Sequence, residues 1–176
     1  MQVYFGHYDI QAIRMKRSAE GSVLTEFEPE FVASVREIFE EKIPFNRLFG
    51  LKLVSIRADG AVGRIDMHPD LIGHVTSTRL HGGVISAGLD AMGGFAVLAA
   101  MGARHMNEPP KQRLNRFFKI GTIDLRVDYL QQAIGDRFEL RARALRLGSR
   151  VASVRMEFLA ADGTLLASGA GAYIVS

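Results

Sequence analysis

The chain has 176 residues, of which 48% are hydrophobic and 23% charged, a composition typical of one soluble domain with a sizeable core. It contains no cysteine, which excludes disulfides and thiolate metal sites and favours a reducing, cytoplasmic location. The net charge of +3 is too small to indicate nucleic-acid binding, and the five histidines show no metal-ligand spacing, so neither a nucleic-acid partner nor a metal site is expected.

The first part of the chain divides into an irregular arm and a regular region. Residues 1–25 show no clear period and are expected to form an N-terminal extension, followed by one domain over residues 26–176. Apolar residues at helical spacing predict a helix over Pro29–Glu41, ended by Pro44. A turn then leads into a hairpin. The turn is expected over Phe45–Gly50, and the two strands of the hairpin over Leu51–Arg57 and Ala61–Met67.

The rest of the chain is predicted to be one long helix followed by strands. A loop over Pro69–Leu80 precedes the helix, which runs from about His81 to Met101, and a polar connection over Gly102–Lys119 follows it. Short turns separate four strand-like runs, Thr122–Leu130, Arg137–Leu145, Val151–Leu159 and Thr164–Val175. Consecutive strands joined by short turns indicate an antiparallel sheet, so we expect an α+β domain whose sheet wraps the helix.

The long helix has two unusual features. Asp90 is the only ionisable side chain over Gly82–Ala103, and a carboxylate in an apolar helix is costly to bury unless chemistry or a specific partner requires it. The lone carboxylate and the many glycines also argue against a membrane span. Gly88, Gly93 and Gly94 each cost about 1 kcal/mol relative to alanine, so we expect close packing of the helix to offset them.

The helix start, His81-Gly82-Gly83, suits a developing negative charge. N–H groups in the first helical turn have no intrahelical partner, and the helix dipole adds positive potential there. One such donor to an oxyanion contributes about 3 kcal/mol to a transition state. The alternative is that the glycines only permit packing and that Asp90 is a structural carboxylate. His81 fits a supporting role at the helix start better than that of a general base.

Two motifs carry a resemblance to a known family. The run His81–Asp90 is similar to the signature of PaaI-type hotdog-fold thioesterases, with the acidic residue nine positions after the histidine. The later run Gly121–Leu130 is also typical of that group. The Pro44–Arg47 turn and the Arg113–Leu130 region look most like the YigI-like bacterial acyl-CoA thioesterases. The resemblance covers roughly Phe31–Val175 and implies a hotdog fold, an antiparallel sheet wrapped around a long central helix.

The resemblance also implies an activity and roles for single residues. The chain would hydrolyse medium- to long-chain acyl-CoA to a fatty acid and coenzyme A, without a cofactor. Asp90 would act as general base or nucleophile, the Gly82 N–H would hold the thioester oxygen, and His81 would shape the helix entrance. The residue matching Thr122 would orient the attacking water. The expected substrate contacts are Gly83, His74, Arg113 and Arg116.

Position along the chain is the basis for most of these substrate contacts. His74 lies near the place where many relatives carry an asparagine. Arg113 and Arg116 belong to the basic connection after the helix, which is placed to meet the phosphates of coenzyme A, although such a connection is usually a solvated loop. Phe117 and Phe118, in the same connection, are expected to help cover a long acyl tail.

Two further functions are compatible with the same residues. The first is a hotdog dehydratase or hydratase acting on acyl thioesters, although that chemistry usually uses a histidine as its base. The second is a non-catalytic acyl-CoA binder, although the chain has no helix-turn-helix segment of the kind found in hotdog sensors fused to DNA-binding modules.

Helix geometry adds an expectation about assembly. Gly82 and Asp90 are eight positions apart, which is about 12 Å along one helix axis at ~1.5 Å per residue. One thioester carbonyl cannot touch both groups, because reacting groups lie within roughly 3 to 3.5 Å of each other. Two antiparallel helices across a twofold axis would bring Gly82 of one chain beside Asp90 of the other. We therefore expect a homodimer, or a dimer of dimers, with shared active sites.

Overall fold

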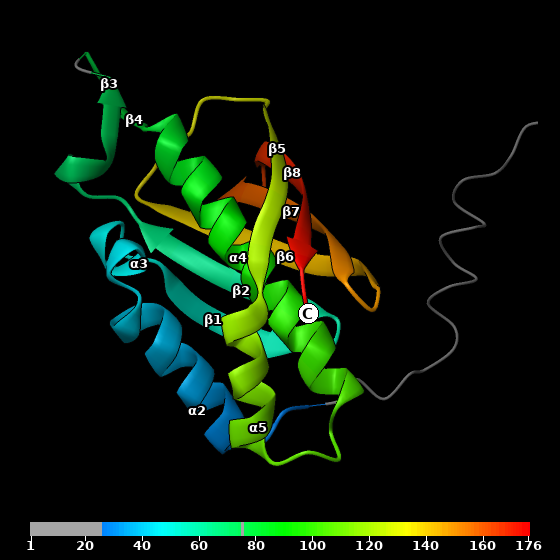
Figure 1. The fold of residues 1–176 in the computed structure, drawn as a ribbon. Helices are drawn as coiled ribbons and strands as arrows, with labels where there is room; N and C mark the ends of the chain where they lie inside the picture. Colours follow the sequence, from blue (N-terminus) through cyan, green and yellow to red (C-terminus); the bar gives the residue numbers. More distant parts are fainter. Residues whose placement is uncertain (1–25, 75) are drawn as a thin grey trace, which may run out of the picture.

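The computed structural model describes residues 26–74 and 76–176, so the predicted N-terminal extension lies outside the described residues. Within that part, six antiparallel strands form one sheet in the order β1-β2-β6-β7-β8-β5, and helix α4 (Gly82–Arg104) packs against it (Figure 1). The strands are β1 (Lys52–Arg57), β2 (Gly60–Asp66), β5 (Gly121–Tyr129), β6 (Arg137–Leu147), β7 (Val151–Ala160) and β8 (Leu165–Ile174). The predicted α+β arrangement of a sheet around one long helix is confirmed.

Helix α4 is the centre of the hydrophobic core. Its side chains Leu89, Met92 and Phe95 have no exposed surface. Strands β6 and β7 bury alternate residues against the helix and leave the others to solvent, as expected for a sheet with one covered face. The helix is long and apolar enough to cross a membrane, but 67% of its most apolar window is buried inside the fold, as in the core helix of a globular domain.

Two of the three helix glycines predicted to allow close packing do so. A Cβ at Gly88 would lie 2.7 Å from a methyl carbon of Leu140, and a Cβ at Gly93 would overlap the hydroxyl of Tyr173. Gly94 differs, because a Cβ there would meet no atom within 4 Å although the residue is buried. The packing explanation is therefore wrong for Gly94, which faces a cavity beside the helix.

Three segments are more regular than the sequence predicts. The expected turn overlaps helix α3 (Pro44–Leu48). The expected loop contains a 3-10 turn, η2 (Pro69–Leu71), and a hairpin of β3 (Ile72–His74) with β4 (Ser77–Leu80). The polar connection contains helix α5 (Pro110–Asn115) and a 3-10 turn, η3 (Arg116–Lys119). Pro44, Pro69 and Pro110 each stand in the first turn of a short helix. A proline there loses no hydrogen bond, because that N–H has no intrahelical partner. The predicted turn, loop and polar connection are therefore wrong in these parts, and proline at the start of a short helix is the signal that indicates them.

The helix predicted over Pro29–Glu41 is present in two parts. An α-helix, α2 (Pro29–Glu37), continues into a π-helical turn, η1 (Ile38–Lys42), and the chain then turns into α3. Phe31 and Val35 of α2 are completely buried, as the periodicity predicts. Figure 1 shows these blue and cyan segments lying along one side of the molecule, next to β1.

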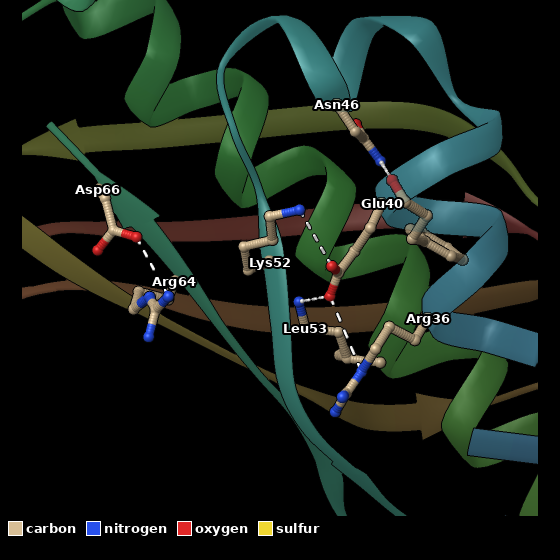
Figure 2. Close-up of polar contacts among 8 residues, drawn as sticks. Arg36, Glu40, Asn46, Lys52, Leu53, Arg64 and Asp66 are labelled. Carbon is tan, nitrogen blue, oxygen red and sulfur yellow. Dashed lines mark hydrogen bonds and ion pairs between the residues drawn. The ribbon is translucent and has the colours of Figure 1, made fainter. Parts of the chain in front are cut away.

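Glu40 of η1 ties this segment to strand β1 (Figure 2). Its carboxylate accepts a hydrogen bond from the Leu53 N–H at 2.8 Å and lies 3.2 Å from Lys52 Nζ. Asn46 of α3, which is buried, donates a hydrogen bond to the Phe39 carbonyl at 3.1 Å. These contacts fix η1 and α3 in place, and both segments line the cavity beside α4.

Removing the Glu40 side chain is expected to destabilise the domain. In Glu40→Ala the Leu53 N–H loses its acceptor in a region where Leu53 is only 4% exposed. We expect a loss of about 1–3 kcal/mol in the free energy of unfolding, measured by urea titration. Glu37→Ala is the matched control, because that carboxylate pairs with Lys42 at the surface and contributes less than about 1 kcal/mol. Equal losses in the two variants would contradict the anchoring role of Glu40.

Candidate active site

Asp90 lies on α4 where strands β5 and β8 pass the helix. Thr122 Oγ1 donates a hydrogen bond to Asp90 Oδ1 at 2.8 Å. The hydroxyl of Tyr173 lies 3.1 Å from the same carboxylate oxygen and 3.1 Å from the Asp90 carbonyl oxygen. Thr122 and Tyr173 are direct partners in the pairing of β5 with β8. The structure thus brings together two predicted site residues, Asp90 and Thr122, and adds a third, Tyr173.

Sequence reasoning missed Tyr173 because an aromatic residue in an alternating strand normally belongs to the core. The side chain is indeed only 1% exposed. The one available signal was its hydroxyl, since a buried tyrosine hydroxyl usually has a hydrogen-bond partner. Burial raises the pKa of Tyr173 far above its ordinary value, and the neighbouring Asp90 carboxylate is the second, smaller cause of the same shift. The hydroxyl therefore stays protonated at neutral pH and is available as a donor.

A β-bulge turns Thr122 towards Asp90. The pairing of β5 with β8 shifts by one residue between Thr122 and Asp124, so that Ile123 is an extra residue in β5. Beyond the bulge, Leu125 and Val127 are partly covered on the helix side of the strand. Without the extra residue, strict alternation would place Thr122 on the face opposite to theirs. The bulge therefore lets one strand present Thr122 and its core residues to the same helix.

A cavity of about 210 Å³ opens beside Asp90. Its polar lining residues are Asn46, Asp90, Thr122 and Tyr173. Its apolar wall includes Phe39, Ile43, Phe45, Phe117 and Ile120, contributed by η1, α3 and the segment before β5. Phe117 thus lines the cavity, in line with its predicted place, whereas Phe118 is 74% exposed and is not part of the wall.

His81 caps the start of α4. Its Nδ1 accepts a hydrogen bond from the Gly83 N–H at 2.9 Å. Because this N–H is engaged by His81, the expectation that Gly83 binds substrate through a free N–H is wrong. The Gly82 N–H has no acceptor within the described part of the chain. Tyr129, on β5, donates a hydrogen bond to the Gly82 carbonyl at 3.0 Å and so holds the first turn in place.

The helix start has its own cavity. About 440 Å³ of space lies next to His81, Gly82 and Tyr129, and Asp90 is not among the residues that line it. The cavity beside Asp90 includes neither His81 nor Gly82. Within one chain, Gly82, the predicted oxyanion donor, and Asp90 therefore face separate spaces, as the length of helix between them requires.

Arg113 is not a substrate contact. It is completely buried, pairs with Glu28, and its guanidinium carbon lies 4.8 Å from the centre of the Phe31 ring. The hydrogen bond from Arg113 lowers the pKa of the Glu28 carboxyl. The prediction was wrong because the partner of this arginine is 85 residues away in the sequence, so the chain gives no local sign of the pair. Arg113 instead joins α5 to the start of α2.

Arg116 and His74 lie outside both cavities. Arg116 is partly exposed and its Nε donates to Glu108 Oε2 at 3.0 Å, and this bond lowers the pKa of the Glu108 carboxyl. His74 is exposed at the end of β3, with Nδ1 2.9 Å from Thr76 Oγ1. Neither lines the space beside Asp90 or the space at the helix start of the same chain.

Comparison with known proteins places the fold and the site in a family. The sequence model of the thioesterase superfamily matches residues 78–167, which include all of α4, β5, β6 and β7. The crystal structure of a protein related to that superfamily from Shewanella oneidensis is similar, with a TM-score of 0.78 and 37% identity over 84% of this chain and 96% of that one. The predicted hotdog fold is confirmed.

Two bacterial relatives are similar over most of their length. The medium/long-chain acyl-CoA thioesterase YigI of Salmonella typhimurium is 36% identical over 141 residues, which are 80% of this chain and 91% of that protein. The protein of the same name from Escherichia coli K12 is 34% identical over the same lengths. These similarities confirm the resemblance drawn from the two motifs. The chain therefore belongs to the thioesterase superfamily and is a thioester hydrolase.

Proposed function

We propose that this protein is an acyl-CoA thioesterase for medium- to long-chain acyl groups. The observation that carries the proposal is a hydrogen-bonded carboxylate, Asp90, in the wall of a largely apolar cavity. The acyl chain would lie against side chains such as Phe39, Ile43 and Phe117, with its thioester carbonyl near Asp90. Similarity to two proteins named medium/long-chain acyl-CoA thioesterases supports the same substrate class.

Asp90 supplies the base or the nucleophile of the reaction. As general base, it takes a proton from a water molecule while the water oxygen attacks the thioester carbon. The carbonyl oxygen becomes an oxyanion, which the Gly82 N–H and the positive end of a helix stabilise. Collapse of this intermediate breaks the C–S bond, and the departing thiolate takes the proton from Asp90. As nucleophile, Asp90 attacks the thioester carbon itself, and the C–S bond breaks to release the coenzyme A thiolate. Water then hydrolyses the resulting anhydride, which frees the fatty acid, restores the Asp90 carboxylate and supplies the proton for the thiolate.

In our proposal, the Asp90 carboxylate and the Gly82 N–H of one active site come from different chains. Strand β5 lies at an edge of the sheet, where its free side is available for pairing with a second copy. Near its two ends, β5 contacts Asp90 through Thr122 and Gly82 through Tyr129. Antiparallel pairing of two β5 strands about their midpoint would therefore bring Asp90 of one chain towards the partner's Gly82. We propose a homodimer, alone or as a dimer of dimers, with two such shared sites.

The geometry favours hydrolysis over the two other functions. A dehydratase or hydratase usually uses a histidine base, but Nδ1 of His81 is engaged by the Gly83 N–H. A non-catalytic binder has no need of a carboxylate contacted by two hydroxyl groups. We propose a cytoplasmic location, which the cysteine-free sequence suggests. We also propose that His74 and Arg116 contact the coenzyme A bound at the active site of a neighbouring subunit.

A thiol-release assay with acetyl-, octanoyl- and palmitoyl-CoA tests the proposed function. We expect a higher kcat/KM on the two longer substrates, because each added methylene leaves water for an apolar wall. Thiol release from acetyl-CoA alone, or from none of the three, would contradict the proposal. Loss of enoyl absorbance from crotonyl-CoA without thiol release would point to the hydratase instead.

Gly94 is expected to set how much of the acyl chain fits beside α4. A side chain at this position would enter the cavity, because a Cβ there meets no protein atom within 4 Å. In Gly94→Val we expect kcat/KM for palmitoyl-CoA to fall about tenfold or more relative to acetyl-CoA. Ala100→Val, on the same helix but outside the cavity wall, is the control and should leave the ratio unchanged. An unaltered chain-length profile in Gly94→Val would place the acyl chain elsewhere.

A further inference from the structure

The two carboxylate oxygens of Asp90 differ in their hydrogen-bond contacts. Oδ1 receives the hydrogen bond of Thr122 at 2.8 Å and lies 3.1 Å from the hydroxyl of Tyr173. Among the described residues, no donor reaches Oδ2. Tyr173 has a second acceptor within reach, the Asp90 carbonyl, but an ionised carboxylate is the stronger acceptor. Two hydroxyl groups from neighbouring strands therefore converge on one oxygen and leave the other without a protein partner.

The position of the Tyr173 hydroxyl depends on Gly93. Any side chain at position 93 would overlap the phenol oxygen, and Gly93 directly follows Met92 in the buried face of α4. Tyr173 is otherwise surrounded by core atoms, with Met156 Sδ 3.8 Å from its hydroxyl. Because the residue is only 1% exposed, its ring has little room to move, and the hydroxyl is held against the Asp90 side chain. The absence of a side chain at Gly93 makes this contact possible.

We propose that Tyr173 is a positioning residue for Asp90, acting with Thr122 to hold Oδ1 so that Oδ2 is the oxygen that reacts. This inference rests on the proposed function and adds a residue and an atom to it. In the general-base form, Oδ2 takes the proton of the attacking water, and in the nucleophilic form it forms the bond to the thioester carbon. In both forms the hydrogen bonds to Oδ1 limit rotation of the carboxylate about its Cβ–Cγ bond.

Tyr173→Phe tests the proposal, because it keeps the ring and removes only the hydroxyl. We expect kcat on palmitoyl-CoA to fall about tenfold, the effect of losing one hydrogen bond to a charged group, while KM changes less than about twofold. In an Asp90→Asn background the same substitution should change the residual rate by less than about twofold, since a residue that acts through Asp90 has nothing left to position. Thermal unfolding of each variant reports whether the fold is intact.

Thr122 provides a second test of the same oxygen, at a strand position where substitution is readily tolerated. Thr122→Val keeps the shape of the side chain and removes the hydroxyl, so it should lower kcat. Thr122→Ser keeps the hydroxyl, so its kcat should stay close to that of the wild type. If Tyr173→Phe does not fold, an unchanged kcat in Thr122→Val would overturn the proposal that hydroxyl groups hold Oδ1, and a loss of kcat in Thr122→Val alone would support it. An unchanged kcat in Tyr173→Phe, or an equal loss in the Asp90→Asn background, would overturn the role of Tyr173. If Asp90→Asn itself keeps full activity, the proposed function of Asp90 fails instead.

Discussion

Replacing Asp90 with asparagine is expected to lower kcat by about 10²–10⁴-fold, the usual contribution of a positioned acid or base. The amide has nearly the same shape as the carboxylate. Its oxygen can still accept the hydrogen bonds that Thr122 and Tyr173 make to Oδ1, and its NH₂ group then occupies the place of Oδ2. The variant therefore removes the oxygen that we propose reacts and leaves the surrounding contacts in place, so the free energy of unfolding should change little.

Thiol release from palmitoyl-CoA and urea unfolding, measured on the same preparation, check this result. Asp59→Asn is the matched control, because Asp59 is an exposed carboxylate in the turn between β1 and β2 and should keep full activity. Activity close to wild type in a well-folded Asp90→Asn protein would show that Asp90 is a structural carboxylate. That outcome would also remove the main support for hydrolysis at this cavity.

Two inactive variants are expected to restore activity when their subunits mix. Gly82→Pro removes the proposed oxyanion donor and should lower kcat by about 10²–10³-fold. The structure accommodates proline there, since Gly82 is the first residue of α4 and His81 before it has φ −66° and ψ 132°, a conformation that suits a residue preceding proline. A Cβ at this position would lie 3.4 Å from the Tyr129 ring, an ordinary contact.

In a mixed dimer of Gly82→Pro and Asp90→Asn chains, one shared site is intact and the other carries both changes. Random assortment makes half of the dimers mixed, so co-refolding equal amounts should recover about one quarter of wild-type activity. Native mass spectrometry with one chain isotopically labelled counts the mixed dimers, and each variant refolded alone is the control. Mixed dimers without recovered activity would mean that the two groups do not share a site.

The sequence predicts the framework of this fold well because its main signals are local. Helical spacing of apolar residues and turn residues between alternating runs are enough to locate α2, α4 and the six strands of the large sheet. Asp90 stands out for a similar reason, since a single carboxylate in a charge-free helix is visible without any structure. The short helices and the β3–β4 hairpin are not predicted, because segments of so few residues carry little periodicity.

What the sequence does not reveal depends on contacts between distant segments. The place of Arg113 in a basic connection predicts a substrate contact, whereas its burial against Glu28 is set by tertiary packing that the sequence does not show. Thr122 was included only by resemblance, because its direction depends on a one-residue shift between β5 and β8 that strict alternation does not predict. Tyr173 has the pattern of a core aromatic residue, and only the position of its hydroxyl beside Asp90 separates it from an ordinary one.

The overlap that any side chain at Gly93 would have with the Tyr173 hydroxyl has a consequence for how this enzyme varies among homologues. The two positions are 80 residues apart in the sequence but occupy one volume in the core. A homologue with a tyrosine on the last strand is expected to keep glycine on the helix, and a homologue with alanine on the helix is expected to have a shorter residue on the strand. Covariation of these two positions would therefore indicate, from sequences alone, which homologues hold the carboxylate equivalent to Asp90 with a phenol.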